Sequence, residues 1–238
     1  MSRINEASKN VMRRAQPAWI ATLLSAAVAW GGYPAAALAS ARSEKSHESD
    51  EVVRFELHPN PQFQRCLAQF PDDAQRAPSV EVTVVRGSQN DSLSLRGRNI
   101  KPGLKFDLFT VEHTNLAADA TVDPAFRGNF GLATYQSDLD ASEEGRVRAA
   151  IRTILLDENF SFDPTVALAP TGAFNVGFWF DDPDAAVGCG FNPQNPTPFN
   201  GDHKAGPLAM ISTPDANTRL GPLCTHADTS TTPARCSP

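Results

Sequence analysis

The sequence predicts an all-β fold, an antiparallel sandwich of about eight short strands with irregular loops, over residues 51–212. Apolar and polar residues alternate in several short segments, which is the pattern of half-buried strands. Turn-forming residues separate these segments about every ten residues. No long helical pattern lies between them, and this disfavours a parallel α/β sheet.

The first alternating segment runs from Glu51 to His58 and places Val53, Phe55 and Leu57 on one side. Prolines and polar residues follow it, so we expect a loop with one short helical turn over residues 59–77. The later segments predict further strands near 80–84, 93–95, 106–112, 132–136 and 174–180, an irregular stretch over 114–129 and a polar turn over 137–145.

The segment 146–155 can be interpreted in two ways. Glu143, Glu144 and the arginines after them are good helix formers, which favours a helix over residues 143–156. The stronger pattern is alternation, which predicts a half-buried strand with one apolar and one arginine-rich side. The apolar side would hold Val147, Ala149, Ile151, Thr153 and Leu155, and the other side Arg146, Arg148 and Arg152.

Residues 1–41 predict a signal peptide that is removed on export. Basic residues precede an apolar run from Ala18 to Trp30, and small-x-small cleavage sequences follow at Ala37–Ala39 and Ala39–Ala41. A membrane anchor is the alternative, but the run is shorter than the roughly 20 residues a span needs. We expect a flexible leader over residues 42–50, no membrane span after cleavage, and a secreted or periplasmic protein.

The chain is acidic, with a formal net charge of −6, and the predicted signal peptide holds four of the basic residues. The remainder is therefore more acidic still, without a basic cluster in the sequence. Such a surface repels phosphate groups, so we expect neither nucleic acid nor an anionic membrane as a partner. The expected partner is an unknown extracellular ligand or a component of the cell envelope.

Four cysteines remain after cleavage, and an even count in an exported chain predicts two disulfides. Three pairings are possible, and we favour Cys66–Cys189 and Cys224–Cys236. The second pair would be a local staple in residues 213–238, a tail that is poor in apolar residues. The Cys and His spacings do not fit a zinc site.

Unusual polar residues concentrate in 173–211, where an acidic turn and a proline-rich loop follow a predicted strand. Three readings stay open: simple turn chemistry, a polar binding site without metal, or a divalent-cation site built from carboxylate oxygens. The only tryptophan outside the predicted signal peptide could be a stacking platform for a flat ligand or part of the core. The candidate binding residues are Trp179, Asp181, Asp182, Asp184, Asp202 and His203.

Sequence motifs for catalysis and cofactors do not occur in the chain, neither a G-x-S-x-G elbow nor H-E-x-x-H, a P-loop or G-x-G-x-x-G. Asp138, Asp140 and Ser142 resemble the opening of a calcium loop, but Glu143 stands where an EF-hand needs glycine. We therefore expect a hairpin turn at these residues. We also expect no cofactor, and a binding or structural module rather than an enzyme.

Three stretches resemble the copper/zinc superoxide dismutase family: GRNIKPGLKFDLFTVEH at 97–113, SDLDASEEGRVRAAI at 137–151 and NVGFWFDDPDAAVGCGF at 175–191. The resemblance covers roughly residues 80–192 and implies a Greek-key sandwich. That family holds its metals with histidines, two of them alternating on one strand, where this chain has Asp107 and Phe109. It implies, as the alternative function, a superoxide-dismutase-like metal-binding protein or enzyme with a degenerate site.

The C-terminal half, over about 173–211, also resembles secreted bacterial proteins of uncharacterised role. They share the Trp-Phe strand, the acidic turn and a Phe-Asn-Gly-acid-His loop, here Phe199 to His203. This resemblance implies a binding site in that region and names no ligand for it.

Overall fold

A computed structural model describes residues 51–87, 90–153, 174–194, 205–224 and 226–237. The predicted signal peptide and leader lie outside the described residues, as do Asp202 and His203. No helix of the described part is long and apolar enough to cross a membrane.

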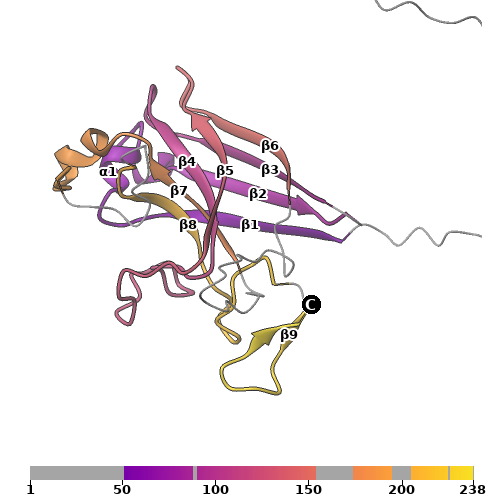
Figure 1. Ribbon diagram of the computed structural model, residues 1–238. Coiled ribbons are helices and arrows are strands. Elements are labelled where there is room, and N and C mark those ends of the chain that lie inside the picture. Colours follow the sequence, from indigo (N-terminus) through magenta and orange to yellow (C-terminus); the bar gives the residue numbers. More distant parts are fainter. Residues whose placement is uncertain (1–50, 88–89, 154–173, 195–204, 225, 238) are drawn as a thin grey trace, which may run out of the picture. The chain divides into compact units, whose positions relative to one another are not determined.

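Eight antiparallel strands form one sheet in the order β5-β4-β7-β8-β1-β2-β3-β6. The two strands at its ends, β5 and β6, lie next to each other, so the sheet curves almost into a barrel (Figure 1). The predicted all-β antiparallel fold is therefore confirmed. The strands are β1 (Val52–Pro59), β2 (Ser79–Val85), β3 (Asp91–Arg98), β4 (Lys105–Val111), β5 (Ala133–Asp140), β6 (Val147–Thr153), β7 (Asn175–Phe180) and β8 (Leu208–Ser212).

The remaining elements are short. They are α1 (Gln64–Leu67), η1 (Ala74–Arg76), η2 (Pro183–Cys189) and a small hairpin of β9 (Ala227–Asp228) and β10 (Arg235–Cys236). The helical turn expected within 59–77 is present as α1. The acidic turn expected after β7 is instead the start of η2, where the Asp182 side chain accepts a hydrogen bond from the Asp184 amide at 2.8 Å.

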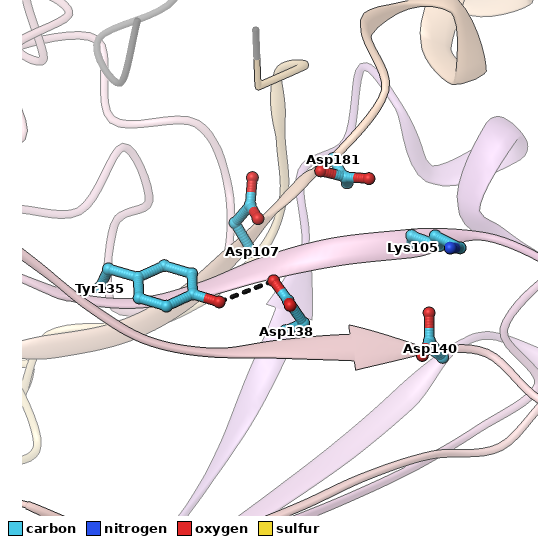
Figure 2. Close-up of a pocket in the computed structure, with 6 residues that line it drawn as sticks. All are labelled: Lys105, Asp107, Tyr135, Asp138, Asp140 and Asp181. Carbon is cyan, nitrogen blue, oxygen red and sulfur yellow. Dashed lines mark hydrogen bonds between the residues drawn. The ribbon is translucent and has the colours of Figure 1, made fainter. Parts of the chain in front are cut away.

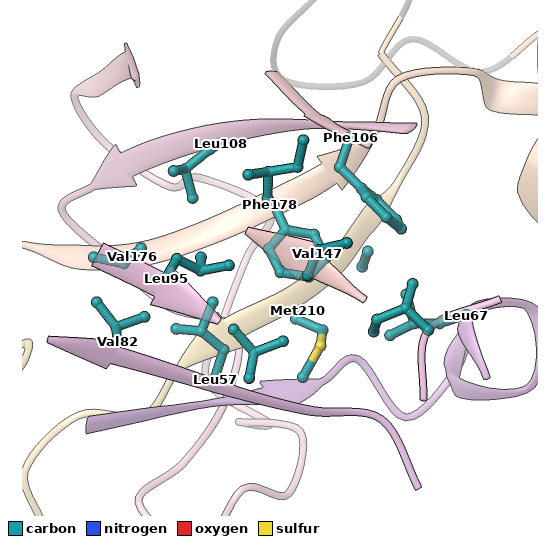
Figure 3. Packing of buried hydrophobic residues seen from close by; sticks show 14 of the residues in the cluster. Leu57, Leu67, Val82, Leu95, Phe106, Leu108, Val147, Val176, Phe178 and Met210 are labelled. Carbon is teal, nitrogen blue, oxygen red and sulfur yellow. The ribbon is translucent and has the colours of Figure 1, made fainter. Parts of the chain in front are cut away.

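The inner face of the sheet encloses the main hydrophobic core (Figure 3). Phe106 and Phe178 from the neighbouring strands β4 and β7 pack with their ring centroids 4.8 Å apart and their rings tilted by 57°. Gly97 of β3 leaves room for its register partner Val147, because a Cβ at Gly97 would lie 2.5 Å from a Val147 methyl. Each large apolar side chain that is fully buried stabilises the fold by about 1.5–3 kcal/mol.

A second cluster packs on the outer face of β4, β7 and β8, where the long connection between β4 and β5 covers the sheet. Trp179 lies at its centre, with the rings of Phe109 and Phe130 edge-on at 5.5 and 5.2 Å. All residues of β7 and β8 are consequently buried. The buried members are Val111, Leu116, Phe130, Trp179, Leu208 and Ile211.

Both disulfides have the pairing favoured from the sequence. Cys66–Cys189 joins α1 to η2 with a Cα–Cα distance of 6.1 Å, and Cys224–Cys236 closes the tail at 5.6 Å. The tail also reaches the main core, where the side chain of Leu223 is 2% exposed and its amide donates to the Phe174 carbonyl. The tail is thus held by apolar burial as well as by its staple.

Two strands differ from the sequence-based expectation: β5 ends later than expected, and β8 was not expected at all. β5 was expected to end at residue 136 and the polar residues after it to form a turn, but the strand continues to Asp140. Pairing with β4 keeps those polar residues extended, and a bulge between Leu108 and Phe109 adjusts the register. The strand β8 is a short apolar run without alternation, since both of its faces are buried.

Candidate functional site

The candidate site is an open pocket of about 490 Å³ on the outer side of β4 and β5, here called the acidic pocket (Figure 2). Two adjacent antiparallel strands and the residue that follows β7 supply its lining. The described lining residues contribute four carboxyl groups, one amine and one phenol. The lining residues are Lys105, Asp107, Tyr135, Asp138, Asp140 and Asp181.

Strand register explains why these side chains meet. Lys105 is paired with Asp140 and Asp107 with Asp138, and paired residues of an antiparallel ladder point to the same face. The fourth carboxylate, Asp181, directly follows β7, and its amide donates to the Lys105 carbonyl at 3.0 Å. The lining is therefore built largely on strands, which hold side chains more precisely than loops do.

Among the described residues that line the pocket, four are aspartates and one is a lysine. Asp107 and Asp138 face each other across the ladder, and like charges in that position destabilise a sheet. Asp107 is also largely withdrawn from solvent, at 8% exposed. A cation bound among these groups would relieve the repulsion between them.

Tyr135 forms one wall of the pocket, and its side chain is half exposed, at 51%. Its hydroxyl donates a hydrogen bond to Asp138 at 2.7 Å, and its ring meets Phe109 edge-on at 5.6 Å. The hydrogen bond to Asp138, then burial and the surrounding negative charge, raise the pKa of Tyr135 to about 12. The phenol therefore stays protonated at neutral pH and remains a hydrogen-bond donor.

Within the described residues, histidine, cysteine and carboxylate side chains do not gather in threes at the spacing needed to hold a metal ion. The acidic pocket can instead offer separate acceptors and one aromatic ring. Such an arrangement suits an organic cation, whose charged head is larger than a metal ion and binds both carboxylates and ring faces.

Of the four candidates that the structure describes, Trp179, Asp181, Asp182 and Asp184, only Asp181 lines the pocket. Trp179 is 1% exposed in the outer cluster, so its ring faces other aromatic rings and not solvent. Asp182 caps η2, and Asp184 is an exposed residue of its first turn. The structure therefore separates these four neighbours in sequence into three different environments.

Five pocket residues were missed by sequence reasoning. Asp138 and Asp140 were interpreted as turn residues, and Asp107 was considered only as a position where the resembled family has a histidine. Lys105 and Tyr135 were given no role. The alternation along these strands was a usable signal, because residues two apart share a face of a strand. What the sequence did not provide was the register of β4 against β5, which brings the two pairs and Tyr135 together.

Comparison with known proteins adds no relative: no family model, no curated protein and no solved structure matches this chain.

Proposed function

We propose that this protein is an exported, non-catalytic β-sandwich module that binds a ligand carrying an ammonium or guanidinium group in the acidic pocket. The observation that carries the proposal is the pocket itself, in which Asp107, Asp138 and Asp140 stand beside the half-exposed Tyr135 ring. Carboxylates attract the charge of such a ligand, and the ring face contributes a further cation–π attraction of about 0.5–1 kcal/mol at an exposed site.

Export is supported by the two disulfides, which persist in oxidising compartments outside the cytoplasm. The expected signal peptide is consistent with the same location. A periplasmic or secreted module would meet its ligand in the envelope or the medium. Basic peptides and polyamines are ligands of the required chemistry.

We further propose that the sheet is a Greek key of the superoxide-dismutase-like kind. Strands β4, β5 and β6 follow one another, and β7 returns to pair with β4. This order, together with the contacts between β5 and β6, supports a Greek key, in which the fourth strand returns to lie beside the first. The turn motifs of the resemblance also support it, since Gly103 and Gly145 have the positive φ angles of 78° and 71° that favour glycine.

The non-catalytic part of the proposal is supported by how the outer face is filled. The resemblance implies two histidine ligands on β4, where this chain has Asp107 and Phe109. In this chain the β4 position Phe109 is packed against the buried Trp179 of β7. The rings of Phe109 and Trp179 offer a metal ion no imidazole nitrogen, and the other β4 position carries the carboxylate of Asp107.

Titration of the purified protein with trilysine, followed by calorimetry, tests the proposal. We expect saturable binding that weakens at high salt, because exposed charges are screened. The double variant Asp138→Asn/Asp140→Asn should lose about tenfold in affinity, the equivalent of about 1.4 kcal/mol. Equal affinity of the variant and the unaltered protein would show that the ligand site lies elsewhere.

A matched control removes the same charge outside the pocket. The variant Asp72→Asn/Glu56→Gln changes two exposed acids on other elements and should bind trilysine as the unaltered protein does. Metal analysis of the same preparation tests the alternative function. Stoichiometric copper in the purified protein would contradict the proposed binding module and would favour a metal protein with a rearranged site.

A further inference from the structure

A second charged surface lies on the outer side of β3 and β6, and it is basic although the chain as a whole is acidic. β3 pairs with β6 along its length (Figure 1). This pairing brings together arginines that are far apart in the sequence. All of them are exposed. This arginine stripe consists of Arg96, Arg98, Arg146, Arg148 and Arg152.

The register within the stripe is unfavourable for the protein alone. Arg96 and Arg148 are direct partners across the β3–β6 ladder, so two guanidinium groups start from opposite positions on one face. Like charges directly opposite each other destabilise a sheet. Two acids lie close to the stripe. Glu81 of β2 is paired with Arg96 on the side of β3 away from β6, and Glu144 lies near Arg146 at the turn before β6.

These two acids offset only part of the positive charge of the stripe. The pKa of Glu144 is lowered by a hydrogen bond from Ser142 and, less strongly, by the charge of Arg146. Within the described residues, the guanidinium groups of the five arginines form neither ion pairs nor hydrogen bonds. Their neighbours on the same face are small, Ser92 and Ser94 on β3 and Ala150 on β6. The guanidinium forks are thus free to bind anions, and serine hydroxyls lie beside them as further donors.

We propose that the arginine stripe binds a linear anionic polysaccharide with sulfate or phosphate groups. Planar guanidinium groups bind such anions through two parallel hydrogen bonds. From Arg146 to Arg152 the stripe extends about 20 Å at the rise of a β-strand, so it can bind several repeats of an extended polymer. An anion between Arg96 and Arg148 would remove the repulsion that their register creates.

Charge distribution favours a narrow polymer over a membrane. A linear polymer contacts the stripe alone, whereas an anionic bilayer is a plane that also approaches the rest of an acidic molecule of net charge −6. Within a Debye length of about 10 Å, that remainder is repelled. Single-stranded nucleic acid is disfavoured because the stripe has no aromatic ring on which a base could stack.

Dextran sulfate is the probe that tests the proposal, with binding measured by calorimetry over a series of salt concentrations. The unaltered protein should bind it with an affinity that falls steeply as salt increases. Arg96→Gln/Arg148→Gln should weaken binding about tenfold and reduce the salt dependence. The control Arg65→Gln/Arg219→Gln removes the same charge from two arginines that form ion pairs outside the stripe, and should bind normally.

Three further ligands separate the possible partners: uncharged dextran, an oligothymidylate and vesicles that contain phosphatidylglycerol. Binding of dextran sulfate alone supports the proposal. Preference for the vesicles or the oligothymidylate would overturn it, as would equal loss of binding in the stripe variant and its control. Asp138→Asn/Asp140→Asn should bind dextran sulfate at least as tightly as the unaltered protein, so failure at this surface is distinguishable from failure at the acidic pocket.

Discussion

The β7–β8 half of the sheet and the β3–β6 half differ in how many of their faces are covered. Every residue of β7 and β8 is buried, because the core lies on one side and the outer cluster around Trp179 on the other. β6 alternates between covered and exposed residues, since only its inner face meets the core. β3 alternates in the same way. We expect β7 and β8, which are buried on both faces, to contribute most to the free energy of unfolding. β3 and β6 are buried on one face only, and their exposed face presents charged groups that can bind a ligand.

The largest expected effect comes from removing the centre of the outer cluster. Trp179→Ala should lower the free energy of unfolding by about 3–5 kcal/mol, because a fully buried aromatic side chain leaves a cavity. Tyr135→Ala on the same outer side should cost much less, since that ring is half exposed. Urea unfolding of both variants measures the difference. Similar losses would mean that the outer cluster is not a second core.

The inner face of the β3–β6 half should respond to overpacking. Gly97→Ala adds a methyl group where Val147 and Val80 methyls would lie at 2.5 and 2.8 Å, at a cost of about 1–3 kcal/mol. Replacement of the neighbour as well, in Gly97→Ala/Val147→Ala, should recover part of that loss. A double-mutant cycle by thermal unfolding gives the coupling, and strict additivity would argue against this contact.

On the outer face of the same strands we expect a smaller effect, which is a gain in stability. Arg148→Gln removes one of two opposed guanidinium groups and should raise the free energy of unfolding by up to about 1 kcal/mol at low salt. The gain should shrink as salt screens the repulsion. Arg65→Gln, which breaks an exposed ion pair, provides the comparison. A loss of stability in Arg148→Gln would show that Arg148 supports the fold.

The smallest effect is confined to alkaline pH. Because the pKa of Tyr135 is raised to about 12 in the folded protein, folding favours its protonated form. Its contribution to stability is complete below the unfolded pKa of about 10 and is lost as the pH rises to about 12. Tyr135→Phe should remove this pH dependence. Ultraviolet titration should show one tyrosine with the raised pKa, and Asp138→Asn should lower it.

The contrast between the two halves also explains which elements could be predicted. Alternation identified the strand that begins at Val147, including its arginine side, because a one-sided strand carries its burial pattern in its sequence. The same rule failed for β8, where Leu208 to Ser212 is buried on both faces and shows no alternation. It also left Trp179 ambiguous between a stacking platform and core, and the structure places it in a second core.

For the candidate site, the sequence alone identified Asp181 but associated it with Asp182, Asp184, Asp202 and His203, its neighbours along the chain. The structure places Asp181 with residues of β4 and β5 that precede it by more than 40 positions. Proximity in sequence was a poor guide, because a strand end and a helical turn send successive side chains in different directions. The described residues do not include Asp202 and His203, so their role stays a prediction.

The sequence by itself determined the all-β class, the inward and outward side of the alternating strands, the cysteine pairs favoured for the two disulfides, and the net charge. These properties follow from local chemistry: side-chain period, turn residues and composition. Only the tertiary structure decided which strands are neighbours and in which register. That choice gathers carboxylates on β4 and β5 and arginines on β3 and β6, and it depends on how all the strands together bury one core, which no single segment specifies.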